Sequence, residues 1–285
     1  DSQMKDHPLT PMRDANLVRV LARQVKGKVG LVAHETVSQG ADAVAAALDN
    51  LQQSGHRFAI VDAICDDDLR STGRAVRNAA LITGGSGIAL GLPDNFRAAG
   101  LLEEGGTGLH LAAGSGRRIM LAGSCSAMTR KQVAHAIASG VPHLQLDPIA
   151  IAEGRTSAAD VVAWIDACPV SSVPLVYSSA DPADVARAQA QLGRDEAGSM
   201  IEHLLGTVAR ALVGRGFDQF VVAGGETSGA VVEALGVRQL RIGQEIDPGV
   251  PWTQSADTAM PLVLALKSGN FGTEDFFTKA WTVLA

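Results

Sequence analysis

The fold is decided by Val221-Val222-Ala223-Gly224-Gly225-Glu226-Thr227-Ser228-Gly229-Ala230, where an apolar strand runs into a glycine turn that opens directly onto a helix. Gly224 and Gly225 can adopt backbone angles that are closed to other residues, and they let a ligand approach the chain closely. The N–H groups of the following helical turn point toward such a ligand, so the junction predicts an anion site. An ordinary strand-to-helix turn is the commoner outcome for a glycine pair, so this motif needs support from elsewhere.

Two further turns provide that support. The apolar run 260–266 reaches Lys267-Ser268-Gly269-Asn270-Phe271-Gly272, where a cation meets a second glycine turn. Gly123-Ser124-Cys125-Ser126 follows a third apolar run. Ligands of parallel sheets bind beyond the carboxyl ends of the strands, so these three turns predict one crevice for a nucleotide. Neither the turn at Gly224 nor the turn after Lys267 has the spacing of a Walker A loop, and no GxGxxG dinucleotide motif occurs.

Individual side chains in these turns also have ordinary interpretations. Ser124 and Ser126 can donate to a phosphate or a ribose, but a serine beside a glycine is more often a turn residue or a helix cap. We expect Lys267 to reach a phosphate through a flexible ammonium group, although most such lysines are solvated surface cations. The residues Thr129-Arg130-Lys131-Gln132 predict a capping box that opens the next helix.

The composition indicates an α/β enzyme. The chain has 285 residues, of which 46% are hydrophobic and only 4% aromatic, and its 31 glycines suit two α/β domains. A formal net charge of -6 gives no general attraction to nucleic acid or to an anionic membrane. The three cysteines form no Cys-x-x-Cys pair, which fits a reducing cytoplasm. No apolar run approaches the roughly 20 residues that span a bilayer.

Apolar periodicity predicts alternating strands and helices, and hence a mainly parallel sheet flanked by helices in each domain. The glycine-rich residues 100–116 have no sustained period, and we expect them to link a first domain, residues 1–100, to a second, residues 117–285. The predicted strands are residues 29–33, 58–64, 80–83, 118–122, 143–147, 175–177 and 220–223. The main predicted helices are residues 41–54, 66–78, 157–167 and 199–213.

The first domain offers groups for a polar substrate. Gly84-Gly85-Ser86-Gly87 is a fourth candidate anion turn, and Asp62 stands at a strand end where a carboxylate can bind hydroxyl groups or act in catalysis. His7 precedes a proline and is by base rate a loop residue, with contact to an acidic substrate as the alternative. The other histidines show no ligand spacing such as His-x-x-x-His, so no metal ligand is assigned.

Five long motifs occur in order along the chain. They are His7-Pro8-Leu9-Thr10-Pro11-Met12 with Asp14, Asn16 and Leu17, Gly84-Gly85-Ser86-Gly87, Ala223-Gly224-Gly225-Glu226-Thr227-Ser228-Gly229, Asp247-Pro248-Gly249-Val250-Pro251-Trp252 and Lys267-Ser268-Gly269-Asn270-Phe271-Gly272. Together they resemble the four-carbon acid sugar kinases over nearly the whole chain. Gly85-Ser86-Gly87 followed by Gly91-Leu92-Pro93 is most similar to the 3-oxo-tetronate kinase branch, and the D-threonate and D-erythronate kinases are the alternative.

The resemblance implies a cytoplasmic two-domain kinase that uses ATP and Mg²⁺ to phosphorylate the terminal (4-) hydroxyl of a four-carbon acid sugar. The positions that match the family's ATP-contacting motifs are Ser124, Gly224, Gly225, Glu226, Thr227 and Gly269. We expect the sugar on the first domain, near His7, Asp62, Ser86 and Gly87. The family's Asp-Asp-x-Thr-Gly motif is absent here, so we expect the chain to lack an N-terminal stretch that helps to build the sugar site.

Two other classes of function are compatible with the same turns. One is a nucleotide-binding module without catalysis, and the other is a sugar-phosphate aldolase or isomerase. ATP consumption that depends on an acid sugar separates a kinase from both. A homo-oligomer is compatible with the sequence, which assigns neither the general base nor the metal ligands.

Overall fold

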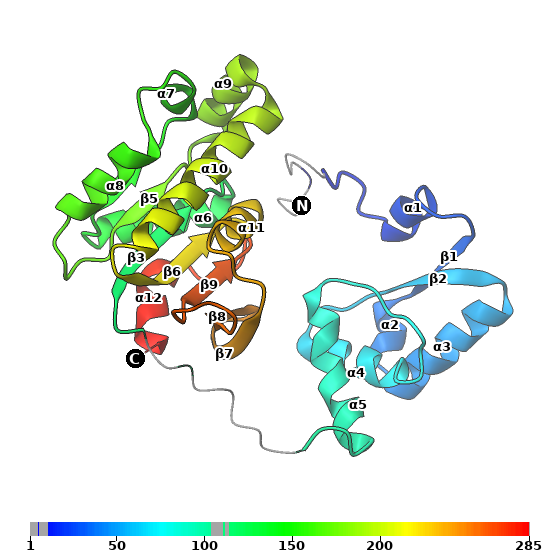
Figure 1. Cartoon of the computed structure of the whole chain (residues 1–285). Coiled ribbons are helices and arrows are strands. Elements are labelled where there is room, and N and C mark those ends of the chain that lie inside the picture. The colour runs from blue at the N-terminus through cyan, green and yellow to red at the C-terminus, as the bar shows by residue number, and fades with distance from the viewer. Residues whose placement is uncertain (1–4, 6–10, 104–110, 112–113, 285) are drawn as a thin grey trace. The chain divides into compact units, whose positions relative to one another are not determined.

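The computed structural model describes residues 5, 11–103, 111 and 114–284, and it divides the chain into two compact units (Figure 1). Unit 1 comprises residues 1–106 and unit 2 comprises residues 107–285. Each unit carries parallel strands flanked by helices, so the predicted α/β class is confirmed. The linker expected over residues 100–116 lies in part outside the described residues.

Unit 1 is built on a two-stranded parallel sheet. β1 (Lys28–Val32) pairs with β2 (His56–Val61), and α3 (Ala41–Gln53) lies in the crossover between them. Gly30 lets α3 approach β1 closely, since a Cβ at this position would lie 2.5 Å from a methyl carbon of Leu51. The other elements of unit 1 are α1 (Leu17–Ala22), α2 (His34–Val37), α4 (Asp66–Ala75), the 3-10 helix η2 (Ser86–Gly91) and α5 (Leu92–Ala98).

The strand predicted over residues 80–83 is wrong. These residues are irregular in the structure, and Leu81 is 87% exposed. The described sheet of unit 1 consists of β1 and β2 alone, so this apolar stretch has no neighbouring strand to bind its backbone. The helix predicted over residues 66–78 is confirmed as α4, although it ends at Ala75.

The described residues of unit 2 form a seven-stranded sheet with the order β4-β5-β3-β6-β9-β8-β7. Its strands are β3 (Arg117–Ala122), β4 (His143–Gln145), β5 (Leu175–Tyr177), β6 (Phe217–Ala223), β7 (Leu240–Asp247), β8 (Val250–Ser255) and β9 (Val263–Lys267). The five strands β4, β5, β3, β6 and β9 are parallel to one another, as the sequence predicts. β8 and β7 extend the sheet in antiparallel fashion, which the sequence analysis did not predict.

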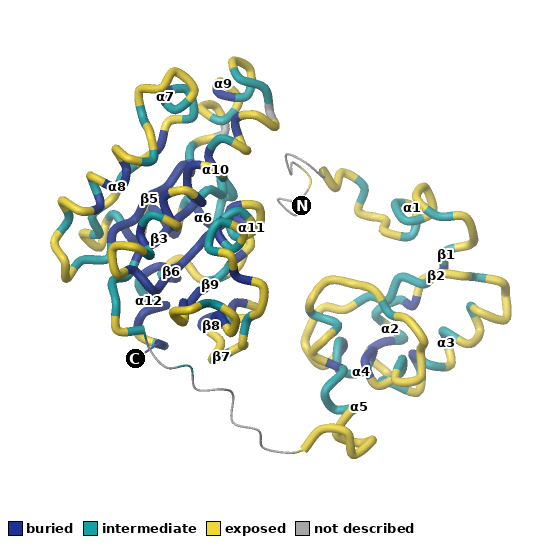
Figure 2. The backbone as a smooth tube through the Cα atoms, in the orientation of Figure 1, coloured by how far each residue is buried: buried dark blue, intermediate teal, exposed yellow. Residues whose placement is uncertain are grey.

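Helices cover both faces of the unit 2 sheet (Figure 1). They are α6 (Ala127–Ala138), α7 (Pro148–Ala152), α8 (Ala158–Ala167), α9 (Pro182–Leu192), α10 (Arg194–Val213), α11 (Gly225–Ala234) and α12 (Phe276–Val283). Side chains of β3 alternate between the two faces, so Leu121 packs in the core with α8, α10 and α11, whereas Met120 packs in the core with α6 and α12. Every residue of β6 is buried, as expected for a central parallel strand (Figure 2).

The helix after β3 begins earlier than predicted. Ser126 caps α6 by accepting a hydrogen bond from the Thr129 backbone N–H (3.2 Å). The capping box predicted over Thr129–Gln132 is therefore wrong. Thr129 and Gln132 are buried instead, and their side chains bind backbone carbonyls of residues 269–273. The start of α6 is thereby tied to the segment that follows β9.

Candidate functional site

Three strand ends meet at one edge of the unit 2 sheet. Ala122 of β3 lies opposite Ala223 of β6, and Ala223 lies opposite Lys267 of β9. Backbone hydrogen bonds also join the turns that follow these strands. The Ser124 N–H donates to the Ala223 carbonyl (3.2 Å), and the Gly224 N–H donates to the Lys267 carbonyl (2.9 Å). The structure therefore brings together the three glycine-containing turns that the sequence analysis singled out.

Glycine is needed where these turns touch. A Cβ at Gly269 would lie 2.6 Å from Ser124 Oγ, and a Cβ at Gly224 would lie 2.7 Å from Thr227 Oγ1. Gly224 also has a φ of +127°, which L side chains rarely adopt. Gly225 differs, because no described atom outside its own helix lies within 4 Å of a Cβ at that position. The turns pack tightly on one another, and the space beside Gly225 is open.

This open space lies at the amino end of α11. The first backbone N–H groups of a helix have no carbonyl partner within the helix, and they carry the positive end of its dipole. α11 begins at Gly225, and no side chain of the preceding Gly224 caps it. Glu226 is exposed, whereas Thr227 is buried against Gly123 and Gly224. The arrangement suits the binding of an anion such as a phosphate.

The turn after β5 also lies at this edge of the unit 2 sheet, and the sequence analysis did not single it out. Ser178 and Ser179 follow β5, and their hydroxyls donate to the carbonyls of Gly123 (3.3 Å) and Ser124 (2.5 Å). Both serines are buried. They hold the backbone of the Ser124 turn in place from the side opposite to β6, since β3 lies between β5 and β6.

Lys267 does not have the flexible ammonium group that the sequence analysis predicted. Its side chain is only 1% exposed, and Nζ donates to the Gly269 carbonyl (3.0 Å), the Ser268 carbonyl (3.3 Å) and Thr129 Oγ1 (3.2 Å). Burial lowers the pKa of Lys267 to about 8. The prediction failed because β9 continues through residue 267, which turns this side chain toward α6 and α12 rather than toward solvent.

Three polar side chains on α6 and its cap face the segment after β9. The sequence analysis named Ser126 as a possible donor to a phosphate or a ribose, but it gave Thr129 and Gln132 no role beyond a capping box. Ser126, Thr129 and Gln132 are spaced by three residues, so they lie along one side of the helix. The Ser126 and Thr129 hydroxyls contact the Gly269 carbonyl, and Gln132 Nε2 donates to the carbonyls of Phe271 (3.0 Å) and Thr273 (2.9 Å). Polar residues at this spacing within an otherwise apolar helix face were the feature of the sequence that could have predicted these buried contacts.

The carboxylates of α10 and α11 interact beside the turns. Burial raises the pKa of Glu202 on α10, and the negative charge of Glu226 raises it further. This repulsion indicates that Glu226 lies near α10 and adds negative charge at the amino end of α11. A cation at this position would relieve that repulsion.

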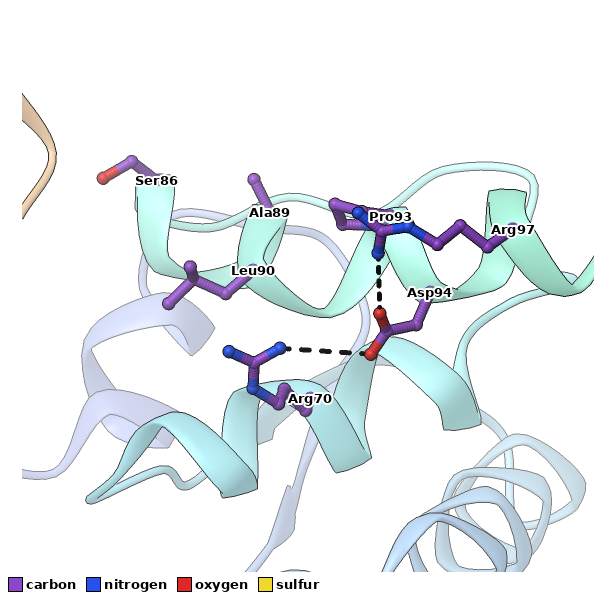
Figure 3. Close-up of a pocket in the computed structure, with 7 residues that line it drawn as sticks. All are labelled: Arg70, Ser86, Ala89, Leu90, Pro93, Asp94 and Arg97. Atoms are coloured by element: carbon purple, nitrogen blue, oxygen red, sulfur yellow. Dashed lines mark hydrogen bonds and ion pairs between the residues drawn. The ribbon is translucent and has the colours of Figure 1, made fainter. Parts of the chain in front are cut away.

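In unit 1, a cavity of about 330 Å³ is lined by residues of α4, η2 and α5 (Figure 3). The lining residues are Arg70, Ser86, Ala89, Leu90, Pro93, Asp94 and Arg97. Arg97 Nη1 donates to Asp94 Oδ1 (3.0 Å), and Arg70 Nη1 lies 4.0 Å from Asp94 Oδ2. Two guanidinium groups and one carboxylate leave one net positive charge, so the cavity suits a small anion.

Two glycines hold the walls of this cavity together. A Cβ at Gly73 on α4 would lie 2.5 Å from the backbone of Gly91, the last residue of η2 and the N-cap of α5. Asn95 Nδ2 also donates to the Gly73 carbonyl (2.8 Å). Because the contact between Gly73 and Gly91 is between backbones, it fixes the spacing between Arg70 on α4 and the residues of η2 and α5.

The sugar-site residues predicted from the sequence are dispersed. Ser86 lines the cavity, whereas Gly87 packs against Leu69, with a methyl carbon 3.2 Å from a Cβ at that glycine. Asp62 is half-buried directly after β2, where its N–H donates to the Val32 carbonyl (3.0 Å). His7 lies outside the described residues. Arg70 and Arg97 were missed, since each stands at an ordinary exposed helix position in the sequence.

No group of three His, Cys, Asp or Glu side chains is arranged to hold a metal ion within the described residues. Likewise, no helix in the described ranges is both long and apolar enough to span a membrane.

Residues 119–277 match the family model described as "Nucleotide-binding C-terminal domain", which covers the edge of the sheet with the four turns. The chain belongs to this family. Residues 1–92 match the model described as "Sugar-binding N-terminal domain". The nucleotide-binding match therefore contains the converging turns, and the sugar-binding match contains four of the seven residues that line the cavity, namely Arg70, Ser86, Ala89 and Leu90. The expected lack of an N-terminal stretch gains no support from the sugar-binding match, which begins at residue 1.

Relatives in this family are named 3-oxo-tetronate kinase. The protein from Cupriavidus necator is 52% identical over 98% of this chain and 64% of its own length, and the one from Pseudomonas savastanoi pv. phaseolicola is 46% identical over 100% and 66%. The chain thus spans just under two thirds of the length of these curated relatives. A solved Salmonella typhimurium structure matches with a TM-score of 0.76 and 38% identity over 98% of this chain and 66% of that one.

Proposed function

We propose that this chain acts as an ATP-dependent kinase that phosphorylates the terminal (4-) hydroxyl of a four-carbon acid sugar, with 3-oxo-tetronate as the preferred acceptor. The observation that carries the proposal is the set of interlocked turns beside the open amino end of α11, within a family nucleotide-binding domain. The names of the curated relatives support the choice of acceptor. A cytoplasmic location, where ATP is made available, belongs to the same proposal.

The nucleotide phosphates would bind at the amino end of α11. Phosphoryl transfer depends on anchored phosphates and on stabilisation of negative charge in the transition state. The backbone N–H groups of Gly225, Glu226 and Thr227 would donate to phosphate oxygens, and Ser124 Oγ in the adjoining turn is a further donor. Gly225, beside which the space is open, would let the phosphates approach the backbone, whereas Gly224 and Gly269 allow the turns to pack on one another.

Mg²⁺ is commonly held in kinases by one or two carboxylates together with substrate phosphates, rather than by a cage of protein ligands. The Glu226 carboxylate fits that role, because it is exposed beside Gly225 and forms no ion pair with another side chain in the described part of the chain. When bound, Mg²⁺ would neutralise charge on the transferring phosphoryl group.

The carboxylate of the acid sugar would bind in the cavity of unit 1. Arg70 lies beyond hydrogen-bonding distance of Asp94, so its donors remain available to an anion. Ser86 would donate to a sugar hydroxyl at the same cavity. Leu90 and Pro93 add apolar surface against which the carbon chain can pack.

A coupled assay of ADP formation tests the proposal. The protein is supplied with ATP, Mg²⁺ and one acceptor at a time, namely 3-oxo-tetronate, D-erythronate, D-threonate and erythritol, which lacks the carboxylate. We expect turnover with the acids, fastest with 3-oxo-tetronate, and none with erythritol. ADP binding without turnover on any acceptor would instead indicate a non-catalytic nucleotide-binding module. A lack of both would refute the proposal.

A further inference from the structure

The carbonyl oxygen of Gly269 is the meeting point of three side chains from two elements. Ser126 Oγ lies 2.6 Å from it, Thr129 Oγ1 2.9 Å and Lys267 Nζ 3.0 Å. The three groups also contact one another, since Thr129 Oγ1 lies 3.1 Å from Ser126 Oγ and 3.2 Å from Lys267 Nζ. A carbonyl oxygen has only two lone pairs, so three donors around the Gly269 carbonyl are more than this oxygen needs to be fully hydrogen-bonded.

The ammonium group in this cluster is buried without a carboxylate partner in the described part of the chain. Its hydrogen-bond partners are two carbonyls and one hydroxyl, and the Phe276 ring centroid lies 5.9 Å from Nζ. A buried charge that is not paired with an opposite charge is costly, which is why burial lowers the pKa of Lys267 to about 8.

The surrounding elements do not supply the missing negative charge. Their charged side chains include Arg130 and Lys131 on α6, Glu226 and Glu233 on α11, Arg241, Glu245 and Asp247 on β7, and Lys279 on α12. Asp247 is already paired with Lys279, and none of these side chains forms an ion pair with Lys267 in the ranges that the structure describes. The nearest site suited to an anion is the group of turns to which Gly269 itself belongs.

We propose that Ser126, Thr129 and Lys267 are positioning residues that clamp the Gly269 turn for nucleotide binding, and that a bound phosphate supplies the negative charge that Lys267 lacks. The inference rests on the proposed function, in that the ligand of these turns is a nucleotide. Lys267 acts through the Gly269 carbonyl and through its charge, and its ammonium group does not need to touch the phosphate.

This role links nucleotide binding to a proton. A phosphate beside the turn favours the charged form of Lys267 and raises its pKa above the value of about 8 in the ligand-free chain. Binding therefore takes up a proton near and above that pH, and affinity falls as the pH rises through it. If only the charged form binds well, affinity falls about tenfold from roughly pH 7 to roughly pH 9.

The test is calorimetric titration of the whole chain with MgADP at about pH 7 and about pH 9, in buffers with different ionisation enthalpies. The wild type is expected to show the tenfold loss and proton uptake at about pH 8. Lys267→Met should bind more weakly at the lower pH, with no such pH dependence and no such uptake. Thr129→Val removes a hydroxyl but keeps the ammonium group, so it should weaken binding several-fold while retaining the pH dependence.

Lys131→Met is the matched control. Lys131 lies on the same helix, but it is exposed and pairs with Glu274 (2.6 Å), so its loss should leave affinity and proton uptake as in the wild type. Wild-type binding with no proton uptake near pH 8 overturns the inference, and this measurement does not depend on whether Lys267→Met folds. Equal pH dependence in Lys267→Met and wild type also overturns it. No MgADP binding by the wild type refutes the proposed function and the inference with it.

Discussion

Gly225→Val should abolish nucleotide binding while leaving the fold intact. Gly225 is the first residue of α11, and no described atom outside that helix lies within 4 Å of a Cβ there. The protein therefore has room for the valine side chain. The same space is where a phosphate would approach the N–H groups of the helix, so the added methyl groups should exclude the ligand rather than disturb the chain.

The two effects differ in size. Valine is slightly more favourable than glycine within a helix, so we expect a change in stability within about 0.5 kcal/mol and an almost unchanged Tm. Two hydrogen bonds to a charged phosphate at about 1.5 kcal/mol each correspond to roughly 3 kcal/mol, or an increase in Kd on the order of 100-fold. Binding should thus be lost without a matching loss of stability.

Thermal denaturation and calorimetric titration with MgADP measure the two quantities on the same preparations. Gly198→Val is the control, because Gly198 is an exposed helical residue of α10 at which a Cβ would lie 3.7 Å from Glu202 Oε1, an ordinary van der Waals distance. It should bind MgADP like the wild type. A Kd of Gly225→Val within about threefold of the wild-type value, a difference below about 0.7 kcal/mol, would show that the phosphates do not lie at this turn.

Three further predictions concern stability and the acceptor. Gly269→Ala should destabilise the fold by about 1–3 kcal/mol because its Cβ would overlap the Ser124 hydroxyl, and an unchanged Tm would refute this packing. Arg70→Gln should raise the KM for the acid sugar and leave the KM for ATP unchanged. Arg74→Gln should alter neither value, because Arg74 is an exposed residue one turn further along α4 that does not line the cavity; equal KM values for the sugar in Arg70→Gln and the wild type would argue against the cavity. Burial raises the pKa of Asp247, but hydrogen bonds from Lys279 and from residue 273 outweigh it and leave the pKa below its ordinary 3.8. This carboxylate therefore stabilises the fold above about pH 4 and loses that contribution as the pH falls through its folded pKa, so Asp247→Asn should lower Tm at about pH 7 and reduce the further loss of Tm in acid.

Local signals in the sequence were enough for the parallel part of the fold. The apolar run 221–223 followed by two glycines predicts a buried strand and a helix start, and both are present as β6 and α11. The helix predicted over residues 157–167 is confirmed by the Ser157 cap and α8. These features depend on residues close together in the chain, so the pattern of nearby side chains specifies them.

The sequence could not predict features that depend on distant partners. The stretch 80–83 has the apolar character of a strand, but it lacks a neighbouring strand, while β7 and β8 form because β9 offers an edge to pair with. Arg70 and Arg97 lie 27 positions apart and line one cavity because Gly73 and Gly91 allow their helices to touch.

Lys267 shows the same division within one residue. The amino-acid pattern alone shows a lysine beside a glycine turn at the end of a strand. The burial of this lysine follows from tertiary packing, because β9 turns its side chain toward Thr129 on α6, 138 positions away in the chain. Whether a charged group meets solvent or protein depends on which elements pack over it, and that packing is a property of the whole fold.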